Sequence, residues 1–321
     1  MGLPVTVYRS TDVGAPQING SVGSLLNVIQ KCLVDGYGSK VGLGWVRAFN
    51  NESTGKCIYR NKISDGGSGG VVTFYALNND LTTTNHTVIF QTAKDATDIN
   101  TLFHPVPFLS RVVSTTGLKW SIIGTTRGFY LTLHETSTNN LHPSSNYRQW
   151  TIFFGDMEPI FNNDAGIFTM VTGNSVSSDI TDLSYPYGVG GSTIMSCEVY
   201  DTDGFNSKTT YRFDIPSYVY SNAGGTYANA EPIENNMTMT FSRPIFSHVN
   251  KISYDRNGTR VFLSQITPSV RFELPGMLIS QTGCYDSFVG FPKVVNFNEL
   301  PYERLRAYYG SVYWIDLTEW Y

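Results

Sequence analysis

One stretch of this chain, residues 22–35, carries the three- and four-residue apolar spacing that marks an amphipathic helix. The apolar stripe consists of Val22, Leu25, Leu26, Ile29, Cys32 and Leu33. Ser21 comes directly before the stretch and is suited to the N-cap position, while Gly36 follows it where a left-handed residue would end the helix. We therefore predict one helix, which packs this stripe on a sheet.

Almost all other segments are typical of strands and turns. The chain contains 33 Thr, 30 Ser, 24 Asn and 30 Gly, and aromatic residues make up 14% of it. Thr and aromatic residues favour strands, whereas Asn, Gly and Ser favour turns. We expect strands at residues 3–9, 43–48, 71–77, 86–91, 118–124, 127–134, 148–155, 192–200, 260–266, 269–274 and 310–316. The predicted fold class is mainly β: a body like a β-sandwich or barrel with one N-terminal amphipathic helix.

The pair of predicted strands at 118–124 and 127–134 shows the clearest local pattern. Phe129, Leu131 and Leu133 occupy every second position, so they share one face of the second strand. The short polar connection between the two strands predicts a β-hairpin.

A Gly-rich stretch at residues 64–70 is the best candidate for an internal boundary. Its sequence, Ser-Asp-Gly-Gly-Ser-Gly-Gly, is typical of a flexible loop. It would separate an N-terminal helix-and-strand region, residues 1–64, from a β-rich body, residues 71–321. The alternative is one continuous domain.

The net charge and the distribution of apolar residues argue against two classes of partner, nucleic acids and membranes. The net charge is −4, and only 15% of the residues are charged, against about 25% in an average soluble domain. A nucleic-acid-binding domain would be basic, so we expect no nucleic-acid partner. No run of roughly 18 apolar residues occurs, so we expect no membrane insertion. The N-terminus lacks the basic region and apolar core of a signal peptide, so the four cysteines are expected to be reduced.

No sequence pattern for catalysis stands out. The five histidines show no His-x-x-x-His or His-Glu-x-x-His spacing. The Gly-x-Ser-x-Gly string at residues 66–70 belongs to the Gly-rich stretch and is followed by a predicted strand, whereas a nucleophile elbow leads into a helix. Asp156 and Glu158 lie close together at the end of a predicted strand and would be the candidate pair for glycoside hydrolysis, but an Asp before a turn normally binds its own backbone. We therefore expect a protein that is not an enzyme, with no catalytic, cofactor-binding or metal-binding residues and no cofactor.

Clusters of aromatic residues are candidates for contact with a partner protein or a glycan, because exposed Tyr and Trp serve both. The segment from 308 to 321 contains six aromatic residues and is expected either to close the core or to dock on a neighbouring subunit. The candidate contact residues are Tyr185, Tyr187, Tyr218, Tyr220, Tyr313, Trp314 and Trp320.

The opening of the chain contains short motifs at set spacing. Tyr8-Arg-Ser-Thr-Asp-Val-Gly-Ala-Pro16 is followed by Gly20, by Gly23-Ser-Leu-Leu26, by Cys32-Leu-Val-Asp-Gly-Tyr-Gly-Ser-Lys40 and by Gly44-Trp45. Across residues 6–60 these motifs resemble the N-terminus of a family of tailed-bacteriophage virion proteins, which are encoded among head–tail and tail structural genes. A looser similarity covers Phe153-Phe-Gly-Asp156 and residues 268–276, and the C-terminal third departs most from the family.

The resemblance implies a structural, non-enzymatic component of a phage particle, assembled in the host bacterial cytoplasm and located in the virion. Its partners would be other copies of itself and other virion proteins. The motif residues implied to be structural are Asp12, Gly14, Pro16, Gly36, Gly38 and Trp45. The first three would shape a turn before the helix, the two later glycines would release the chain after it, and the tryptophan would anchor the next strand.

The leading hypothesis is a tail- or neck-associated protein that assembles as a symmetric oligomer. The alternative is a receptor- or glycan-binding virion protein, or one that decorates the capsid, with host-surface glycan as a partner. A tail-borne hydrolase that uses Asp156 and Glu158 ranks third.

Overall fold

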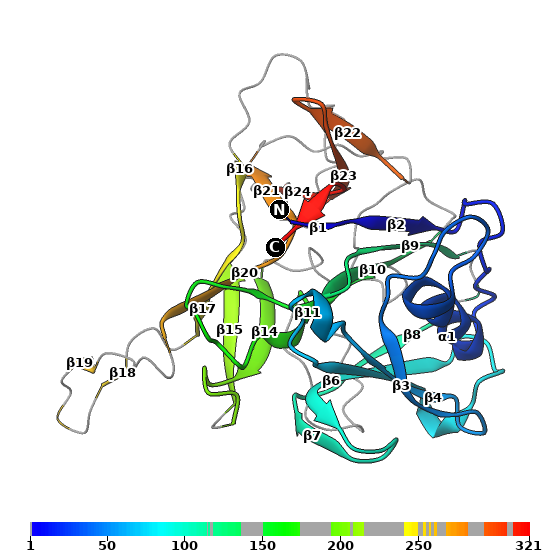
Figure 1. Ribbon diagram of the computed structural model, residues 1–321, viewed down its shortest axis with the longest axis horizontal. Coiled ribbons are helices and arrows are strands. Elements are labelled where there is room, and N and C mark those ends of the chain that lie inside the picture. The colour runs from blue at the N-terminus through cyan, green and yellow to red at the C-terminus, as the bar shows by residue number, and fades with distance from the viewer. Residues whose placement is uncertain are drawn as a thin grey trace, which may run out of the picture.

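The computed structural model is mainly β, which confirms the predicted fold class (Figure 1). The pairs of strands that build its larger sheets are antiparallel. The structure describes residues 2–113, 115, 118–135, 150–173, 194–205, 208–214, 241–249, 253–254, 257, 260–261, 268–281, 292–306 and 311–321.

Two larger sheets come mostly from the first half of the chain. The central sheet has the order β13 (Phe168–Val171), β11 (Trp150–Asp156), β10 (Gly128–Glu135), β9 (Leu118–Gly124) and β2 (Thr6–Arg9). The N-terminal sheet has the order β3 (Val46–Asn51), β4 (Lys56–Arg60), β5 (Val71–Ala76), β6 (Thr87–Ala96) and β7 (Leu102–Pro105), and β8 (Leu109–Val112) also pairs with β6.

Two further sheets come from later segments. The lateral sheet has the order β12 (Glu158–Pro159), β20 (Val270–Glu273), β17 (Ile245–His248), β15 (Lys208–Asp214) and β14 (Ile194–Tyr200). The C-terminal sheet has the order β16 (Phe241–Ser242), β21 (Met277–Gln281), β24 (Ser311–Asp316), β23 (Leu300–Arg306) and β22 (Val294–Phe297). Two small pairs complete the set, β1 (Leu3–Pro4) with β25 (Glu319–Trp320) and β18 (Ser253–Tyr254) with β19 (Arg260–Val261).

The central sheet is buried on both faces. On the first face, Phe129, Leu131 and Leu133 of β10 lie in one core with the helix and the N-terminal sheet, so the predicted alternation is confirmed. On the second face, Tyr130 of β10 and Phe153 of β11 lie in a separate core with the lateral and C-terminal sheets. We call these the first core and the second core. The described chain is thus layered around the central sheet, whose strands are apolar on both sides because both sides are covered.

The predicted helix is present. Helix α1 spans Val22–Gln30, and one π-helical turn, η1, spans Lys31–Asp35. The Ser21 hydroxyl accepts a hydrogen bond from the Ser24 N–H at 3.3 Å, which confirms the N-cap. Gly36 has φ 80° and ψ 174°, so it takes a positive φ but an extended ψ, not the left-handed helical conformation that we expected. The chain turns sharply here because Tyr37 and Lys40 pair their backbones immediately afterwards.

The Gly-rich loop at 64–70 joins two neighbouring strands of the N-terminal sheet, β4 and β5. A division of the chain at this loop therefore falls within one sheet. The loop is anchored: the Ser68 N–H donates to the Asp156 carboxylate at 3.0 Å, and the Gly69 N–H donates to the side-chain oxygen of Asn61 at 2.8 Å. These bonds correct the expectation of a flexible loop, because buried side chains supply acceptors for its backbone.

Most predicted strands are present, with ends that differ by a few residues. The hairpin of β9 and β10 is confirmed, and the Thr125 N–H donates to the Gly128 carbonyl at 2.8 Å in its turn. The strand expected at 43–48 begins later, at Val46, and the one expected at 260–266 is described only at β19. The strands that we did not predict include β4, β13, β15, β17 and β21 to β23, most of which are short.

Candidate functional site

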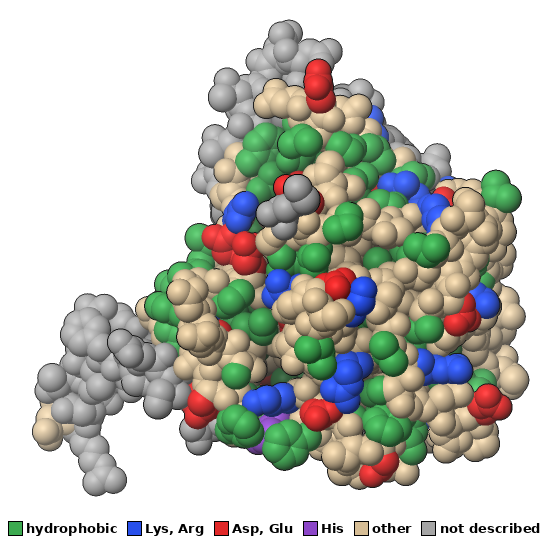
Figure 2. Space-filling model, in the orientation of Figure 1, with side chains coloured by type: hydrophobic (Ala, Val, Ile, Leu, Met, Phe, Trp, Pro, Cys, Tyr) green, Lys and Arg blue, Asp and Glu red, His purple; other side chains and the backbone are tan. Residues whose placement is uncertain are grey.

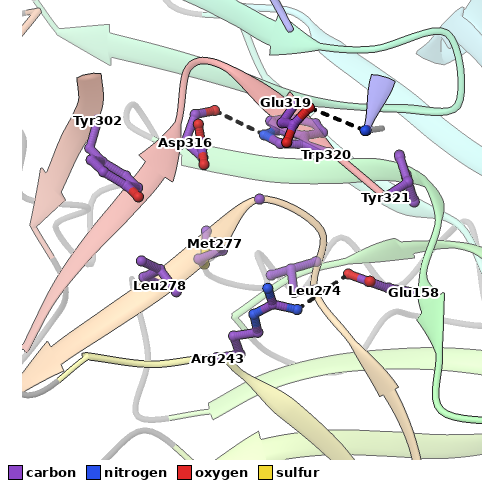
Figure 3. Close-up of a pocket in the computed structure, with 12 residues that line it drawn as sticks. Glu158, Arg243, Leu274, Met277, Leu278, Tyr302, Asp316, Glu319, Trp320 and Tyr321 are labelled. Atoms are coloured by element: carbon purple, nitrogen blue, oxygen red, sulfur yellow. Dashed lines mark hydrogen bonds and ion pairs between the residues drawn. The ribbon is translucent and has the colours of Figure 1, made fainter. Parts of the chain in front are cut away.

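A cavity of about 270 Å³ lies where β1 and β25 meet the C-terminal sheet (Figure 3). Its charged and aromatic lining residues include Glu158, Arg243, Tyr302, Asp316, Glu319 and Trp320. These side chains come from segments that are far apart in the sequence, and the pairing of β1 with β25 brings the two ends of the described chain to the same place. The cavity is therefore a product of the complete fold.

Trp320 lines this cavity and is only 2% exposed. Its indole N–H donates to the Asp316 carbonyl at 2.9 Å. The turn before β21 passes so close to the indole that a Cβ on Gly276 would lie 2.0 Å from the Trp320 ring nitrogen. A glycine is needed at this turn because any side chain would displace the tryptophan.

Arg243 supplies the positive charge of the cavity. Its guanidinium lies 2.8 Å from the Glu273 carboxylate and 3.8 Å from that of Glu158. The hydrogen bond to Glu273 holds the pKa of Arg243 above its ordinary value. Because this guanidinium is already shared between two carboxylates, the lining offers more negative than positive charge to a ligand.

The other carboxylates of the cavity are also engaged within the chain. The Asp316 carboxylate accepts hydrogen bonds from the N–H and the hydroxyl of Thr318, and Glu319 accepts one from the Gly2 N–H at 3.1 Å. Burial, with a smaller contribution from the Asp316 charge, raises the pKa of the Tyr302 phenol above its ordinary value. These groups suit the binding of a polar side chain or a small polar molecule, since none is arranged as a base beside a nucleophile.

Asp156 and Glu158 point into different environments and do not form a pair. Asp156 is fully buried, and burial raises its pKa above the ordinary value, against the hydrogen bonds from Ser68 and the charge of Arg127. The Asp156 carboxylate holds the Gly-rich loop, while its backbone carbonyl accepts a hydrogen bond from the Tyr321 hydroxyl at 2.7 Å. Asp156 therefore has a clear architectural role.

The predicted aromatic contact residues divide into two groups. Tyr185, Tyr187, Tyr218 and Tyr220 lie outside the described residues. Tyr313, Trp314 and Trp320 are 1%, 1% and 2% exposed, which corrects their assignment as contact residues. In the described part of this segment, residues 311–321, β24 and β25 pair with other strands and these three rings are buried, which is the core-closure alternative.

The motif residues before and after the helix form one braced unit. The Asp12 carboxylate accepts hydrogen bonds from the Arg9 N–H at 2.7 Å, from the Tyr37 hydroxyl at 2.7 Å and from the Lys40 ammonium at 2.6 Å. Gly38 has φ 56°, and a Cβ there would lie 2.5 Å from the carbonyl oxygen of the opposite turn. Asp12 therefore fixes the two turns against each other.

The remaining motif residues tie this unit to the central sheet. The Pro16 carbonyl accepts a hydrogen bond from the Trp120 indole at 3.0 Å. Trp45 is 2% exposed, packs on Phe129 and donates to the Thr125 carbonyl at 3.1 Å, directly before β3 begins. These contacts connect the turn before the helix, the helix exit and the start of β3 to one another and to the central sheet.

Two of the exposed side chains of this unit are apolar. Val13 is 92% exposed and Val41 is 76% exposed. They lie on the two turns that Asp12 holds together, residues 10–16 and 36–42, which we call the turn tip. An isolated exposed valine is ordinary, but two on one braced support form a candidate contact point.

An aromatic cluster around His104 was not foreseen from the sequence. The His104 ring lies 4.1 Å from Phe103, 4.8 Å from Tyr200 and 5.4 Å from Phe205, measured between ring centroids. The Lys94 ammonium lies 3.6 Å from the Phe205 ring centroid. The cluster joins the N-terminal and lateral sheets, and no local pattern could reveal it because its members are about one hundred positions apart.

Further observations bear on metals, membranes and thiols. Among the residues that the structure describes, no group of three His, Cys, Asp or Glu is placed to hold a metal ion. In the same residues, no helix combines the length and the apolar character needed to cross a membrane. Cys32, Cys57 and Cys197 are buried free thiols.

Comparisons with known proteins add no support for the family resemblance beyond its motifs. The sequence matches no protein-family model, and no curated protein is significantly similar to it. The resemblance across residues 6–60 therefore depends on the motifs alone.

Proposed function

We propose that this chain is a non-enzymatic structural subunit of a tailed-bacteriophage particle, associated with the tail or neck, that assembles as a symmetric oligomer. In this proposal the chain is made in the host bacterial cytoplasm, becomes part of the virion and contacts its own copies and other virion proteins. The turn tip is the observation that carries the proposal, since Val13 and Val41 stand exposed on a rigid support.

A rigid apolar tip suits assembly because binding then costs little conformational entropy. The Lys40 ammonium and the Tyr37 hydroxyl are bound to the same Asp12 carboxylate, so both turns are already ordered before a partner arrives. The residues that build the tip are also those whose motifs resemble the phage family. On the face in Figure 2, acidic and basic side chains are interspersed, so no large field of one charge would repel a second copy.

The test is a double substitution, Val13→Asp with Val41→Asp. We expect the variant to assemble to a lower mass in light scattering and to be depleted from purified particles measured by mass spectrometry. Charges at a desolvated contact oppose association. Phe161→Asp is the matched control, because Phe161 is 47% exposed at a separate loop. The proposal fails if wild-type chain is absent from particles or if the double variant assembles like wild type.

A receptor- or glycan-binding role, or capsid decoration, is the second candidate, and the cluster around His104 favours it. Phe103 and Phe205 are 48% and 56% exposed, and aromatic faces of this kind stack on sugar rings. Phe103→Ala with Phe205→Ala would abolish adsorption of the purified protein to host cells under this candidate. This candidate is ruled out if the double variant adsorbs as well as wild type, or if wild type does not adsorb.

A further inference from the structure

The hairpin of β22 and β23 projects from the upper end of the molecule in Figure 1. Asn298 and Glu299 connect the two strands with φ values of 47° and 69°. Two consecutive residues with positive φ form a type I′ turn, the tight connection of a two-residue hairpin. In such a hairpin the residues that flank the turn, Phe297 and Leu300, form a hydrogen-bonded pair.

This pair fixes the direction of every backbone group in β22. Hydrogen-bonded and non-hydrogen-bonded pairs alternate in an antiparallel ladder, so Val295 also bonds to β23 and its neighbours do not. The Arg304 N–H donates to the Lys293 carbonyl at 2.8 Å, which is the next bond that this alternation requires. The N–H and C=O groups of Val294 and Asn296 therefore point away from β23.

Beyond β22 the C-terminal sheet has no further strand among the residues that the structure describes. The strand sequence Val-Val-Asn-Phe contains no charge and no proline, two of the devices that protect a sheet edge. Val294 is 42% exposed, and Leu300 beside the turn is 45% exposed. An uncharged edge with outward backbone donors and acceptors is a template for another strand.

We infer that β22 pairs antiparallel with β22 of a second copy of this chain across a twofold axis. The edge is self-complementary: Val294 would lie opposite the partner subunit's Asn296, and Asn296 opposite the partner subunit's Val294. Each of these pairs exchanges two hydrogen bonds, so about four form in all. The inference rests on the proposed function, because so short a contact is too small for an independent dimer and acts within an assembly of copies.

The first test is a cysteine cross-link in the full chain. The twofold axis places Val295 opposite the partner subunit's Val295 in a non-hydrogen-bonded pair, with Cα atoms roughly 4.5 Å apart, a separation that a disulfide can span. We expect Val295→Cys to form a covalent dimer under mild oxidation. The control is Val270→Cys in β20, a valine that is 39% exposed, which should remain monomeric on a denaturing gel. Equal yields from the two variants would overturn the inference.

The second test removes only the outward donor. Asn296→Pro in the Val295→Cys background deletes an N–H that the hairpin does not use, and the residue opposite is already Pro301. We expect the dimer yield to fall by about tenfold or more, because each strand loses a donor. Circular dichroism verifies that the variant is folded. An unchanged yield, or slow amide exchange at Val294 and Asn296 in diluted monomer, would show that the edge is not open to a second copy.

The turn-tip variant separates the two proposals. If Val13→Asp with Val41→Asp lowers the assembled mass while Val295→Cys forms no dimer, the proposed function stands and the edge pairing falls. If the Val295→Cys dimer forms but the chain is absent from particles, the edge pairing stands and the phage role falls.

Discussion

The first and second cores share the central sheet but are built from different parts of the chain. The first core joins the helix and the N-terminal sheet, which come from one continuous stretch of sequence, through apolar contacts. The second core joins short strands of the lateral and C-terminal sheets, and buried ion pairs border it, Arg271 with Asp164 and Arg9 with Glu303. Local apolar packing thus specifies the first core, whereas in the second a wrong pairing of strands would leave a buried charge without its partner.

The largest effect is expected from breaking a buried ion pair at the second core. Asp164→Ala leaves Arg271, which is 0% exposed, without the carboxylate that accepts two hydrogen bonds at 2.7 Å. We expect the free energy of unfolding to fall by about 3–5 kcal/mol in urea denaturation. A loss below about 1 kcal/mol would remove the distinction between the two cores.

The double variant Asp164→Ala with Arg271→Met is the control for that experiment. Replacing both charges leaves no buried charge without a partner, so we expect much of the lost stability to return. If the double variant is as unstable as Asp164→Ala alone, packing rather than charge explains the loss.

A smaller loss is expected in the first core. Leu131→Ala removes a fully buried side chain between the central and N-terminal sheets, and we expect a loss of about 2–4 kcal/mol in the same denaturation assay. Val46→Ala is the matched control, since Val46 is 56% exposed and should change stability by less than about 0.5 kcal/mol. Equal effects of the two substitutions would show that the first core does not depend on apolar burial at this position.

The smallest effect is expected at the turn tip, and it depends on pH. Burial would raise the pKa of Asp12, but hydrogen bonds from Lys40, Tyr37 and the Arg9 N–H hold it below its ordinary value. Its contribution to stability is therefore present above the ordinary pKa and is lost as pH falls through the lowered one. We expect Asp12→Asn to cost about 1 kcal/mol at pH 7 and progressively less in acid, measured by denaturation at a series of pH values.

Glu303 provides a control with the opposite sign. Burial raises its pKa above the ordinary value, against the charge of Arg9. Its contribution is complete below the ordinary pKa and is lost as pH rises through the raised one. As pH falls, the stability of wild type relative to Glu303→Gln should therefore rise, whereas its stability relative to Asp12→Asn should fall. Parallel pH trends for the two variants would contradict this assignment of causes.

The parts of the fold that sequence reasoning found are those encoded locally. The helix follows from apolar spacing and from Ser21, and the hairpin of β9 and β10 follows from alternation around a short turn. In both elements the contacting residues are close enough in sequence for a pattern to record them. The roles expected of Asp12 and of the glycines after the helix were implied by the family resemblance instead, and Asp12 contacts Tyr37 and Lys40 at separations of 25 and 28 positions.

The parts that were missed depend on distant pairings. Asp156 accepts a hydrogen bond from Ser68 at a sequence separation of 88 positions, and Arg271 donates one to Asp164 at a separation of 107 positions. A single sequence contains no sign of either contact. The lateral and C-terminal strands are short, and short apolar runs carry little periodicity. The cavity beside Trp320 and the exposure of Val13 follow from these pairings and were equally hidden.

Burial on both faces of the central sheet also constrains how this protein can change over generations. From Phe129 to Leu133, every residue of β10 is at most 5% exposed. A strand with one solvent face tolerates change at alternate positions, but here a library of single substitutions would find an unbroken run of intolerant sites. Drift in β10 would require compensating changes in both cores at once, so this strand should vary little as lineages diverge.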